Sequence, residues 1–383
     1  GEPHHFPDRD GFPSYRSQTS RQHSAAYCGN RTSLQVEANM SRIAIIGAGA
    51  WGTGLSIILG RRGSHQIQLW AHEKEVCDSI AATGINQIFL PQQPIPQCVT
   101  ATSSLKQALQ DAEIVISVMP SQHCRSLLLQ MRPYLHQGIL LVSATKGLEP
   151  QTLLRMTEVI SAVVSSGDGF VPRVGALSGP SFALEAARGD PTALTIASAD
   201  DELARIVQKE FSDARFRLYT NDDVIGVELG GALKNIIALA AGVCSGLGFG
   251  HNSIAALITR GLAEITRLVV ACGGRSETVA GLAGLGDLVL TCTGELSRNR
   301  SVGLELGRGR KLPDIIAAMH GMVAEGISTT QAAVGLADAH GIEMPIASQM
   351  HAILHHGKSP TTAINELMTR TAKSETGLSR ERF

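Results

Sequence analysis

The sequence of 383 residues predicts an α/β domain followed by an all-helical domain. Between residues 40 and 219, short apolar runs alternate with helical patterns, which is typical of a mainly parallel sheet covered by helices. From about residue 220 the pattern is helical, with little strand character. We therefore expect a sheet domain over 40–219 and a helical domain over 220–370, between a leader at 1–39 and a flexible tail at 371–383.

The leader differs in composition from the rest of the chain. Residues 1–39 are rich in Pro, Ser, Arg, His and Gln and have no periodic apolar face, so we expect them to be disordered. They contain no apolar segment of the kind found in secretory signals. An organellar transit peptide and a true start at Met40 are alternative interpretations, although four acidic residues weigh against a transit peptide.

Composition excludes several classes of function. The net charge is -1 and the 33 basic residues are dispersed, so the sequence shows no electrostatic footprint for nucleic acid. The longest apolar stretch, 236–250, contains five Gly or Ser residues and is too short for a membrane span. Seven scattered cysteines without C-x-x-C spacing indicate reduced thiols. We expect a soluble cytoplasmic protein without nucleic-acid or membrane partners.

The first strand and the first helix of the sheet domain are joined by a glycine-rich turn. Ile43 to Ile46 form a buried strand, residues 53–62 a helix, and Gly47, Gly49 and Gly52 lie between them with the spacing G-x-G-x-x-G. Gly47 permits a tight turn, Gly49 lets the backbone approach a pyrophosphate, and Gly52 lets the helix pack on the strand. This order predicts a Rossmann-like dinucleotide site, with a tight turn that binds no ligand as the alternative.

The end of the second strand, residues 66–70, bears on the choice of dinucleotide. NAD-specific folds place Asp or Glu there to hold the ribose 2′-OH. Here Ala71 or His72 takes that place, and Glu73 follows one residue later. Because an imidazole can donate a hydrogen bond to a 2′-phosphate, we expect NADP or both cofactors to be used.

Later strands of the sheet should deliver residues to its carboxyl edge, where open α/β folds bind ligands. Residues 113–118 lead into Met119-Pro120-Ser121, and residues 138–145 lead into Lys146 and Gly147. Two more strands are expected at 174–177 and 191–197, the first running into a turn, Ser178-Gly-Pro-Ser-Phe-Ala183. From position alone, Lys146 is either a cleft residue or an ordinary solvated lysine.

The helical domain is expected to contain helices at 223–247, 253–272, 299–306 and 329–340. Its glycines allow close helix packing, and the sequence has no internal repeat. Farther along, His351 and His355 have an i, i+4 spacing that could hold a metal on a helix. Without a nearby carboxylate motif, we interpret this pair as a solvated helix face and expect no metal site.

Three polar segments of this domain lie in apolar surroundings. Lys234 and Asn235 stand at the expected start of an apolar helix, where burial would lower the pKa of the lysine toward the range useful for proton transfer. Asp287 follows a glycine-rich, uncharged run, and Arg298 and Arg300 flank an asparagine in an arrangement suited to phosphate. Taken alone, each of these segments could have a purely structural role, as a snorkelling lysine, a helix cap or a surface ion pair. Together they could supply a base, its partner and an anion clamp.

Seven motifs follow one another along residues 40 to about 367. They lie at 47–53 (GAGAWGT), 144–149 (ATKGLE), 177–183 (LSGPSFA), 230–235 (GGALKN), 283–293 (AGLGDLVLTCT), 297–300 (SRNR) and 323–326 (VAEG). In this order they resemble the motifs of the bacterial-type NAD(P)-dependent glycerol-3-phosphate dehydrogenases. The resemblance implies a cytoplasmic oxidoreductase that reduces dihydroxyacetone phosphate with NAD(P)H and supplies the glycerophospholipid backbone. It also leads us to expect a homodimer.

The resemblance further implies roles for individual residues. Lys234 would be the proton donor and acceptor, Asp287 its partner, and Lys146 a contact of both cofactor and substrate. The implied substrate-binding residues are Lys146, Gly179, Ser181, Lys234, Asn235, Asp287, Ser297, Arg298 and Asn299. The implied cofactor-binding residues are Gly47, Gly49, Ala50, Trp51, Gly52, His72, Lys146, Ala183, Arg298, Val323 and Glu325. Ala50 and Ala324 depart from the Ser and Val usual in the family, and Arg300 adds only supporting charge.

Two other functions remain as alternatives. A related two-domain dehydrogenase of a hydroxyacyl or sugar-acid substrate would share the opening fold, but we would not expect it to carry Lys146, Lys234 and the 297–299 run together. A non-catalytic NAD(P)-binding sensor or scaffold is the second alternative. Loss of Lys234 or Asp287 would favour it, and both residues are present.

Overall fold

An eight-stranded sheet forms the first part of the chain in the computed structural model, which describes residues 41–167, 169–319, 321–372 and 375. The predicted leader and most of the predicted tail lie outside the described residues. The strand order is β3-β2-β1-β4-β5-β6-β7-β8. The strands are β1 (Ser41–Ile46), β2 (His65–Trp70), β3 (Val99–Thr102), β4 (Ile114–Ser117), β5 (Leu140–Ser143), β6 (Arg173–Ser178), β7 (Thr192–Ala197) and β8 (Phe216–Asn221).

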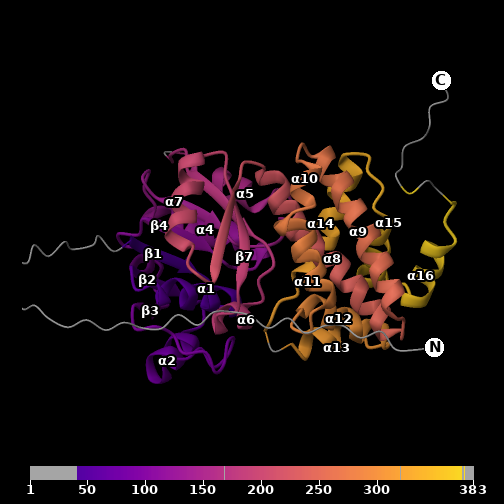
Figure 1. The fold of residues 1–383 in the computed structure, drawn as a ribbon, viewed down its shortest axis with the longest axis horizontal. Coiled ribbons are helices and arrows are strands. Elements are labelled where there is room, and N and C mark those ends of the chain that lie inside the picture. The colour runs from indigo at the N-terminus through magenta and orange to yellow at the C-terminus, as the bar shows by residue number, and fades with distance from the viewer. Residues whose placement is uncertain (1–40, 168, 320, 373–374, 376–383) are drawn as a thin grey trace, which may run out of the picture. The chain divides into compact units, whose positions relative to one another are not determined.

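Helices cover both faces of this sheet (Figure 1). Ile43 and Ile45 of β1 pack toward α1 (Ala50–Arg61) and α7 (Asp201–Phe211), whereas Ala44 and Ile46 pack toward α4 (Cys124–Met131) and α5 (Met156–Val164). Burial on both faces explains why the strand is an unbroken apolar run. The helices of this part are α1 (Ala50–Arg61), α2 (Lys74–Thr83), α3 (Leu105–Leu109), η1 (Ser121–His123), α4 (Cys124–Met131), η2 (Arg132–Tyr134), α5 (Met156–Val164), α6 (Ala183–Arg188) and α7 (Asp201–Phe211).

The sheet and its first helix differ from the sequence prediction in three ways. The strands β3 and β8 were not expected, because β3 has only four residues and β8 alternates buried and exposed side chains at an edge. The strand β7 runs antiparallel to β6 and parallel to β8. The helix α1 begins at Ala50 rather than Thr53, because Gly52 is accommodated within its first turn.

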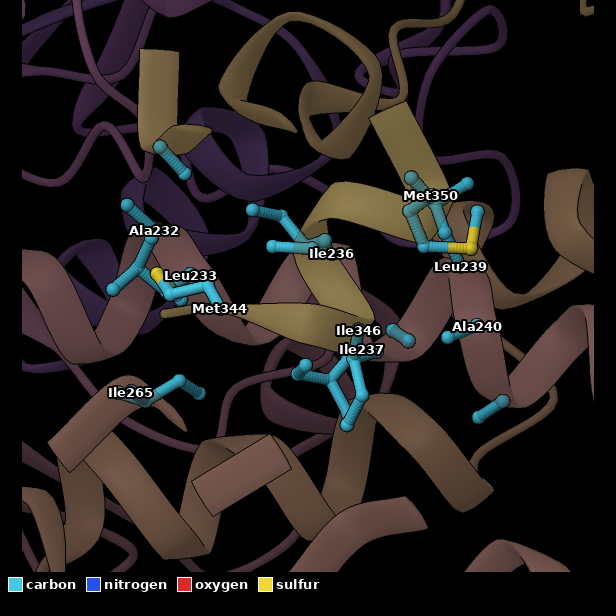
Figure 2. Close-up of a cluster of buried hydrophobic side chains, with 14 of the residues drawn as sticks. Ala232, Leu233, Ile236, Ile237, Leu239, Ala240, Ile265, Met344, Ile346 and Met350 are labelled. Carbon is cyan, nitrogen blue, oxygen red and sulfur yellow. The ribbon is translucent and has the colours of Figure 1, made fainter. Parts of the chain in front are cut away.

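The second part of the chain is helical and surrounds α8 (Val224–Gly246) (Figure 1). The other elements are α9 (His251–Ala271), α10 (Ser276–Val279), the π-helix η3 (Leu282–Gly286), α11 (Asp287–Thr293), α12 (Arg298–Gly307), α13 (Leu312–Ala317), α14 (Glu325–Ala339), α15 (Pro345–His356) and α16 (Pro360–Met368). Figure 2 shows Ile236 and Ile237 of α8 in an apolar core with Ile265 of α9 and Met350 of α15. The predicted fold class, a Rossmann-like domain followed by a helical domain, is confirmed.

Glycines let α8 and α12 pack backbone to backbone. A Cβ on Gly242 would lie 2.0 Å from the carbonyl oxygen of Arg300, and one on Gly303 would lie 2.0 Å from that of Leu239. Lys234 lies in the middle of α8, so its predicted position at the start of a helix is wrong; the helix begins ten residues earlier, at Val224.

The helix α8 is also the only described helix that is, by itself, long and apolar enough to cross a membrane. In its most apolar window, 89% of the residues are buried inside the protein, as in a core helix. The described residues offer a second possible membrane span only if Ser276–Thr293 and Arg298–Gly307 are counted as one helix. These two segments are bent by 48° at the break between them.

Candidate active site

The glycine-rich turn between β1 and α1 leaves room for a ligand at one position. Gly47 has a φ of 121°, and a Cβ there would lie 2.6 Å from the carbonyl oxygen of Val118. A Cβ on Gly52 would lie 1.8 Å from the carbonyl oxygen of Gly47. Packing therefore requires these two glycines. A Cβ on Gly49 would meet nothing within 4 Å, which fits a space kept for the backbone to meet a pyrophosphate.

Unused hydrogen-bond donors gather at the start of α1. The N-cap residue, Gly49, has no side chain to accept from the first N–H groups of the helix. The indole Nε1 of Trp51 is buried without a hydrogen-bond partner among the described residues. Ala50 contributes no hydroxyl, so the backbone and Trp51 are the donors that fit an anionic diphosphate here. Ala183, at the start of α6, lies against this helix at Gly54.

The end of β2 requires one correction to the sequence interpretation. Ala71 is fully buried in the core on the α1 side of the sheet, so it cannot face the ribose of a dinucleotide. His72 is exposed, and its ring centroid lies 6.0 Å from that of Trp70. Of the two residues proposed for this place, the structure leaves His72, with the exposed Glu73 next to it at the start of α2.

Three charged side chains from distant parts of the chain meet between the two domains. Lys146 follows β5, Lys234 lies on α8, and Asp287 begins α11, directly after the π-helix η3. The Nζ of Lys146 donates to Oδ2 of Asp287 at 2.7 Å, and the Nζ of Lys234 donates to Oδ1 of the same carboxylate. Asp287 is only 1% exposed, so one buried carboxylate pairs with two lysines.

Burial lowers the pKa of Lys234 to about 8. Removal from water disfavours the ammonium, Asp287 opposes this effect, and the positive charge of Lys146 adds to it. A pKa in this range lets the same amine donate and accept a proton near neutral pH.

Thr291 completes the surroundings of Lys234, and the sequence analysis gave it no role. Its Oγ1 accepts from Lys234 Nζ at 2.7 Å and donates to the backbone carbonyl of Asp287 at 2.6 Å. Because the hydroxyl of Thr291 donates its proton to that carbonyl, a lone pair of Oγ1 is left to accept from the lysine. The spacing i, i+4 from Asp287 on one helix face is the signal that could have found it.

The turn after β6 holds Lys146 from the other side. Lys146 Nζ donates to the carbonyl oxygen of Gly179 at 2.9 Å and to Ser181 Oγ at 3.4 Å. Gly179 has a φ of 142°, and a Cβ there would lie 2.9 Å from Cα of Leu194. The residues predicted from this turn are therefore brought together with Lys146.

The start of α12 presents a cation, Arg298, that forms no hydrogen bond with any residue that the structure describes. Ser297 is buried, and its Oγ accepts from the backbone N–H of Arg300, which makes it the N-cap of α12. Arg298 as a whole residue is exposed, and among the described residues its guanidinium has no hydrogen bond and no ion pair within 4 Å. The guanidinium end is nevertheless surrounded by protein, which lowers its pKa, and the negative charge of the nearby Glu325 opposes this effect. Arg298 and the free N–H groups of the first turn form a site suited to a phosphate.

Glu325, at the start of α14, forms hydrogen bonds with Ser121 of the sheet domain. Its carboxylate accepts from Ser121 through the backbone N–H at 3.0 Å and through Oγ at 2.6 Å. Burial raises the pKa of Glu325, and these two hydrogen bonds oppose the rise. Val323 lies half-buried two residues earlier. The sequence placed Ser121 at a strand end but did not indicate this contact.

The paired residues still to be placed are the asparagines Asn235 and Asn299 and the histidines His351 and His355. Asn235 and Asn299 are buried, and their side chains bond to each other. His351 and His355 have ring centroids 4.9 Å apart on α15. The described part of the chain contains no group of three or more His, Cys, Asp or Glu residues that could hold a metal ion.

Comparisons with known proteins agree with this geometry. Residues 42–204 match the family model of the NAD-dependent glycerol-3-phosphate dehydrogenase N-terminus, and residues 223–365 match that of the C-terminus. Glycerol-3-phosphate dehydrogenase (NAD(P)+) of Koribacter versatilis is 67% identical over 339 residues, which cover 88% of this chain and 100% of the relative. The enzyme of the same name from Acidobacterium capsulatum is 57% identical over the same shares.

A solved structure extends the likeness to the fold. Glycerol-3-phosphate dehydrogenase from Coxiella burnetii has a TM-score of 0.81 and 41% identity, covering 86% of this chain and 99% of that one. The resemblance inferred from the seven motifs is confirmed. The chain belongs to the NAD-dependent glycerol-3-phosphate dehydrogenase family.

Proposed function

We propose that this protein catalyses the reversible reduction of dihydroxyacetone phosphate to sn-glycerol 3-phosphate with NAD(P)H, and so supplies the glycerophospholipid backbone. The observation that carries the assignment is the pairing of Asp287 with Lys146 and Lys234 in a protein whose Arg298 has no hydrogen-bond partner among the described residues. The first cluster can handle a proton and an oxyanion, and the arginine can hold a phosphate.

Each residue of the cluster has a distinct part in this mechanism. NAD(P)H, when bound, supplies the hydride for C2 of the substrate. Lys234, as an ammonium, donates a proton to the carbonyl oxygen of C2, and in the reverse direction its neutral amine accepts one. Lys146 adds positive charge near the same oxygen as negative charge develops there. Asp287 and Thr291 orient the Lys234 amine.

The dinucleotide itself fits the residues around the glycine-rich turn. The open space at Gly49, the uncapped start of α1 and the unpartnered Trp51 Nε1 would hold its diphosphate. His72 would lie near the adenosine ribose, and Glu325 would contact the cofactor from the helical domain. These assignments follow from the family resemblance together with the exposure and hydrogen bonding described above.

Steady-state kinetics tests the function as a whole. The wild type is expected to oxidise NADPH and NADH in the presence of dihydroxyacetone phosphate and to release glycerol 3-phosphate. Turnover of a hydroxyacyl or sugar-acid substrate in its place would identify the related dehydrogenase instead. Cofactor binding without turnover of any of these substrates would identify the sensor or scaffold.

Arg298→Ala is expected to weaken binding of the phosphorylated substrate by about 1.5–3 kcal/mol, the contribution of a charge-assisted hydrogen bond. The KM for dihydroxyacetone phosphate measures the loss. Arg310→Ala is the matched control, because Arg310 is exposed and, among the residues that the structure describes, its side chain pairs only with Glu305. If the wild type reduced phosphate-free dihydroxyacetone as efficiently as the phosphate ester, Arg298 would not be an anion clamp.

His72→Glu is expected to shift cofactor preference toward NADH. A carboxylate at this exposed position would accept from the ribose 2′-OH of NADH and repel the 2′-phosphate of NADPH. Placed at Ala71 instead, it would lie in the core. The measurement is the ratio of kcat/KM for the two cofactors, and the wild type should use NADPH as well as or better than NADH. An unchanged ratio in the variant would assign the choice to Glu73 or another group.

The predicted boundary at 219/220 would fall inside β8, which ends at Asn221. We therefore propose that the sheet domain ends with β8 and that the helical domain begins with α8 and extends to residue 370. We further propose a homodimeric assembly and a cytoplasmic location. Six described cysteines are free thiols, which supports a reducing compartment. The homodimer rests on the family resemblance. Sedimentation of the purified protein and fractionation of cells test the last two statements.

A further inference from the structure

The helix α8 contacts the sheet domain through a buried carboxylate. Glu228 of α8 is 7% exposed, and its Oε1 accepts from the backbone N–H of Thr157 at 2.9 Å. Its Oε2 accepts from Thr157 Oγ1 at 2.5 Å and from Arg155 Nη1 at 2.8 Å. Arg155 and Thr157 lie at the start of α5, which covers one face of the sheet. We call Arg155, Thr157 and Glu228 the docking cluster.

The docking cluster supplies an acceptor that α5 lacks. The N-cap residue of α5, Arg155, has no side-chain oxygen, so Glu228 accepts from an N–H group of the first turn in its place. Burial raises the pKa of Glu228, and Arg155 and the two donors of Thr157 oppose the rise. The charged carboxylate is therefore stabilised only while α5 and α8 remain in contact.

A short segment joins Lys146 to the docking cluster. Leu148 follows Lys146 closely in the chain, and its backbone pairs with that of Arg155 in an isolated antiparallel bridge. The side chain of Leu148 is fully buried in the apolar core of the helical domain. The segment that carries Lys146 is therefore fixed to the helical domain by Leu148 and, through Arg155, by Glu228. The contact between α5 and α8 thus determines where Lys146 lies relative to Lys234.

A glycine lets α8 approach the sheet closely beside the docking cluster. A Cβ on Gly231 would lie 2.4 Å from the Oγ of Ser178, at the end of β6. Ser178 is buried, and its Oγ has no hydrogen-bond partner among the described residues. Gly231 is three residues from Glu228 and three from Lys234, so it neighbours both on the surface of the helix. The part of α8 that carries the proton donor is therefore in direct contact with the sheet domain.

We propose that Glu228 is a positioning residue, which holds α8 against the sheet domain and so sets the spacing between Lys146 and Lys234 and keeps them out of water. This inference rests on the proposed function. The hydrogen bonds of the Glu228 carboxylate to described residues all lie within the docking cluster, so it acts on the reaction through the position of α8. Asp287 belongs to the same domain as Lys234 and would stay paired with it if α8 moved.

Glu228→Ala should lower kcat for the reduction of dihydroxyacetone phosphate by about 10²-fold, because small misplacements at a reacting centre have effects of this size. The KM for dihydroxyacetone phosphate should change much less. Arg298 lies on α12, which packs backbone to backbone on α8 and would move with Lys234. A loss of kcat with a retained KM is the result expected for a misplaced proton donor.

The pH profile gives a second readout, with a defined direction. Among the described residues, the charged or titratable groups that face Lys234 are Asp287, Lys146 and Cys292. Burial and the charge of Lys146 lower the pKa of Lys234 to about 8, while Asp287 raises it. Looser docking weakens the first two effects and leaves Asp287 in place, so in Glu228→Ala the pKa should rise by about one pH unit. The break in kcat/KM should move up with it in both directions of the reaction.

The same pKa can be measured without turnover. Acetic anhydride acylates only the neutral amine, so the pH at which Lys234 becomes half-reactive, followed by mass spectrometry, gives its pKa. This value should rise in Glu228→Ala whatever the substrate is. A wild type that did not reduce dihydroxyacetone phosphate would count against the proposed function, whereas an unchanged half-reactive pH in the variant would count against the role of Glu228.

A second substitution tests the same contact without changing the docking cluster. In Gly231→Ala the new methyl group would meet Ser178 Oγ and push α8 away from β6. This variant should reproduce the loss of kcat and the upward shift of the pH break. Gly231→Ala/Ser178→Ala removes the hydroxyl that the methyl group meets, so the double variant should recover most of both. These two variants keep the test decisive if Glu228→Ala fails to fold.

Glu264→Ala is the matched control for the loss of a buried carboxylate. Glu264 is 3% exposed on α9 and accepts from the backbone N–H of Ile346 at 2.8 Å, so it caps α15 inside the helical domain. Its loss should lower the melting temperature, as the loss of Glu228 does, but leave kcat and the pH break unchanged. The inference would be overturned if Glu228→Ala and Gly231→Ala lowered only the melting temperature, or if their pH break fell instead of rising.

Discussion

Replacing Lys234 by alanine is expected to lower kcat for both reduction and oxidation by at least about 10²-fold while NADPH binding survives. Lys234 is buried in α8, and it donates to Asp287 and Thr291. No other described amine has this combination of a buried carboxylate partner and a pKa lowered to about 8. Steady-state kcat in both directions and a NADPH titration measure the two parts of the result.

The pH profile provides an independent check on this assignment. Reduction needs the ammonium, so kcat/KM in that direction should fall as the pH rises through about 8. Oxidation needs the amine, so its kcat/KM should rise with pH and level off above the same value. Both breaks should vanish in Lys234→Ala. Lys209→Ala, which removes an exposed lysine on α7, should leave both profiles intact. A Lys234→Ala enzyme with nearly normal kcat would exclude this lysine as the proton carrier.

The dinucleotide turn could be predicted from the sequence because its physics is local. Gly47, Gly49 and Gly52 lie within one turn between a strand and a helix. Their spacing along the sequence is therefore enough to predict the turn and its ligand. Buried strands and long apolar helices were likewise predictable, since their side chains pack on both sides. The edge strand β8 was not, because its alternating pattern resembles that of a surface segment.

The contacts across the domain interface could not be predicted in the same way. Ser121 and Glu325 are 204 residues apart, and nothing near either residue indicates the other. The same holds for the bond between Asn235 and Asn299, 64 residues apart. The sequence indicated the residue types required for the chemistry. It did not indicate that Asp287 pairs with both lysines, or that Ala71 is turned into the core.

Asp287→Asn is expected to lower kcat/KM by about 10²–10³-fold, the usual effect of removing one preorganised electrostatic group from an active site. The carboxylate is buried between Lys146 and Lys234, and its removal leaves two lysines without their shared counter-charge. Breaking a buried ion pair costs about 3–5 kcal/mol, so the free energy of unfolding should fall as well. Thermal unfolding and NADPH titration are therefore measured beside the kinetics.

The direction of the pH shift separates an electrostatic role of Asp287 from a purely structural one. Asp287 raises the pKa of Lys234, while burial and the charge of Lys146 lower it. Without the carboxylate, the pKa of Lys234 should fall below about 8, so reduction should decline from a lower pH and oxidation should level off at a lower pH. Asp314→Asn, at an exposed position on α13, should leave both breaks in place. An Asp287→Asn enzyme with reduced activity but unchanged breaks would mean that Asp287 shapes the site without controlling the charge of Lys234.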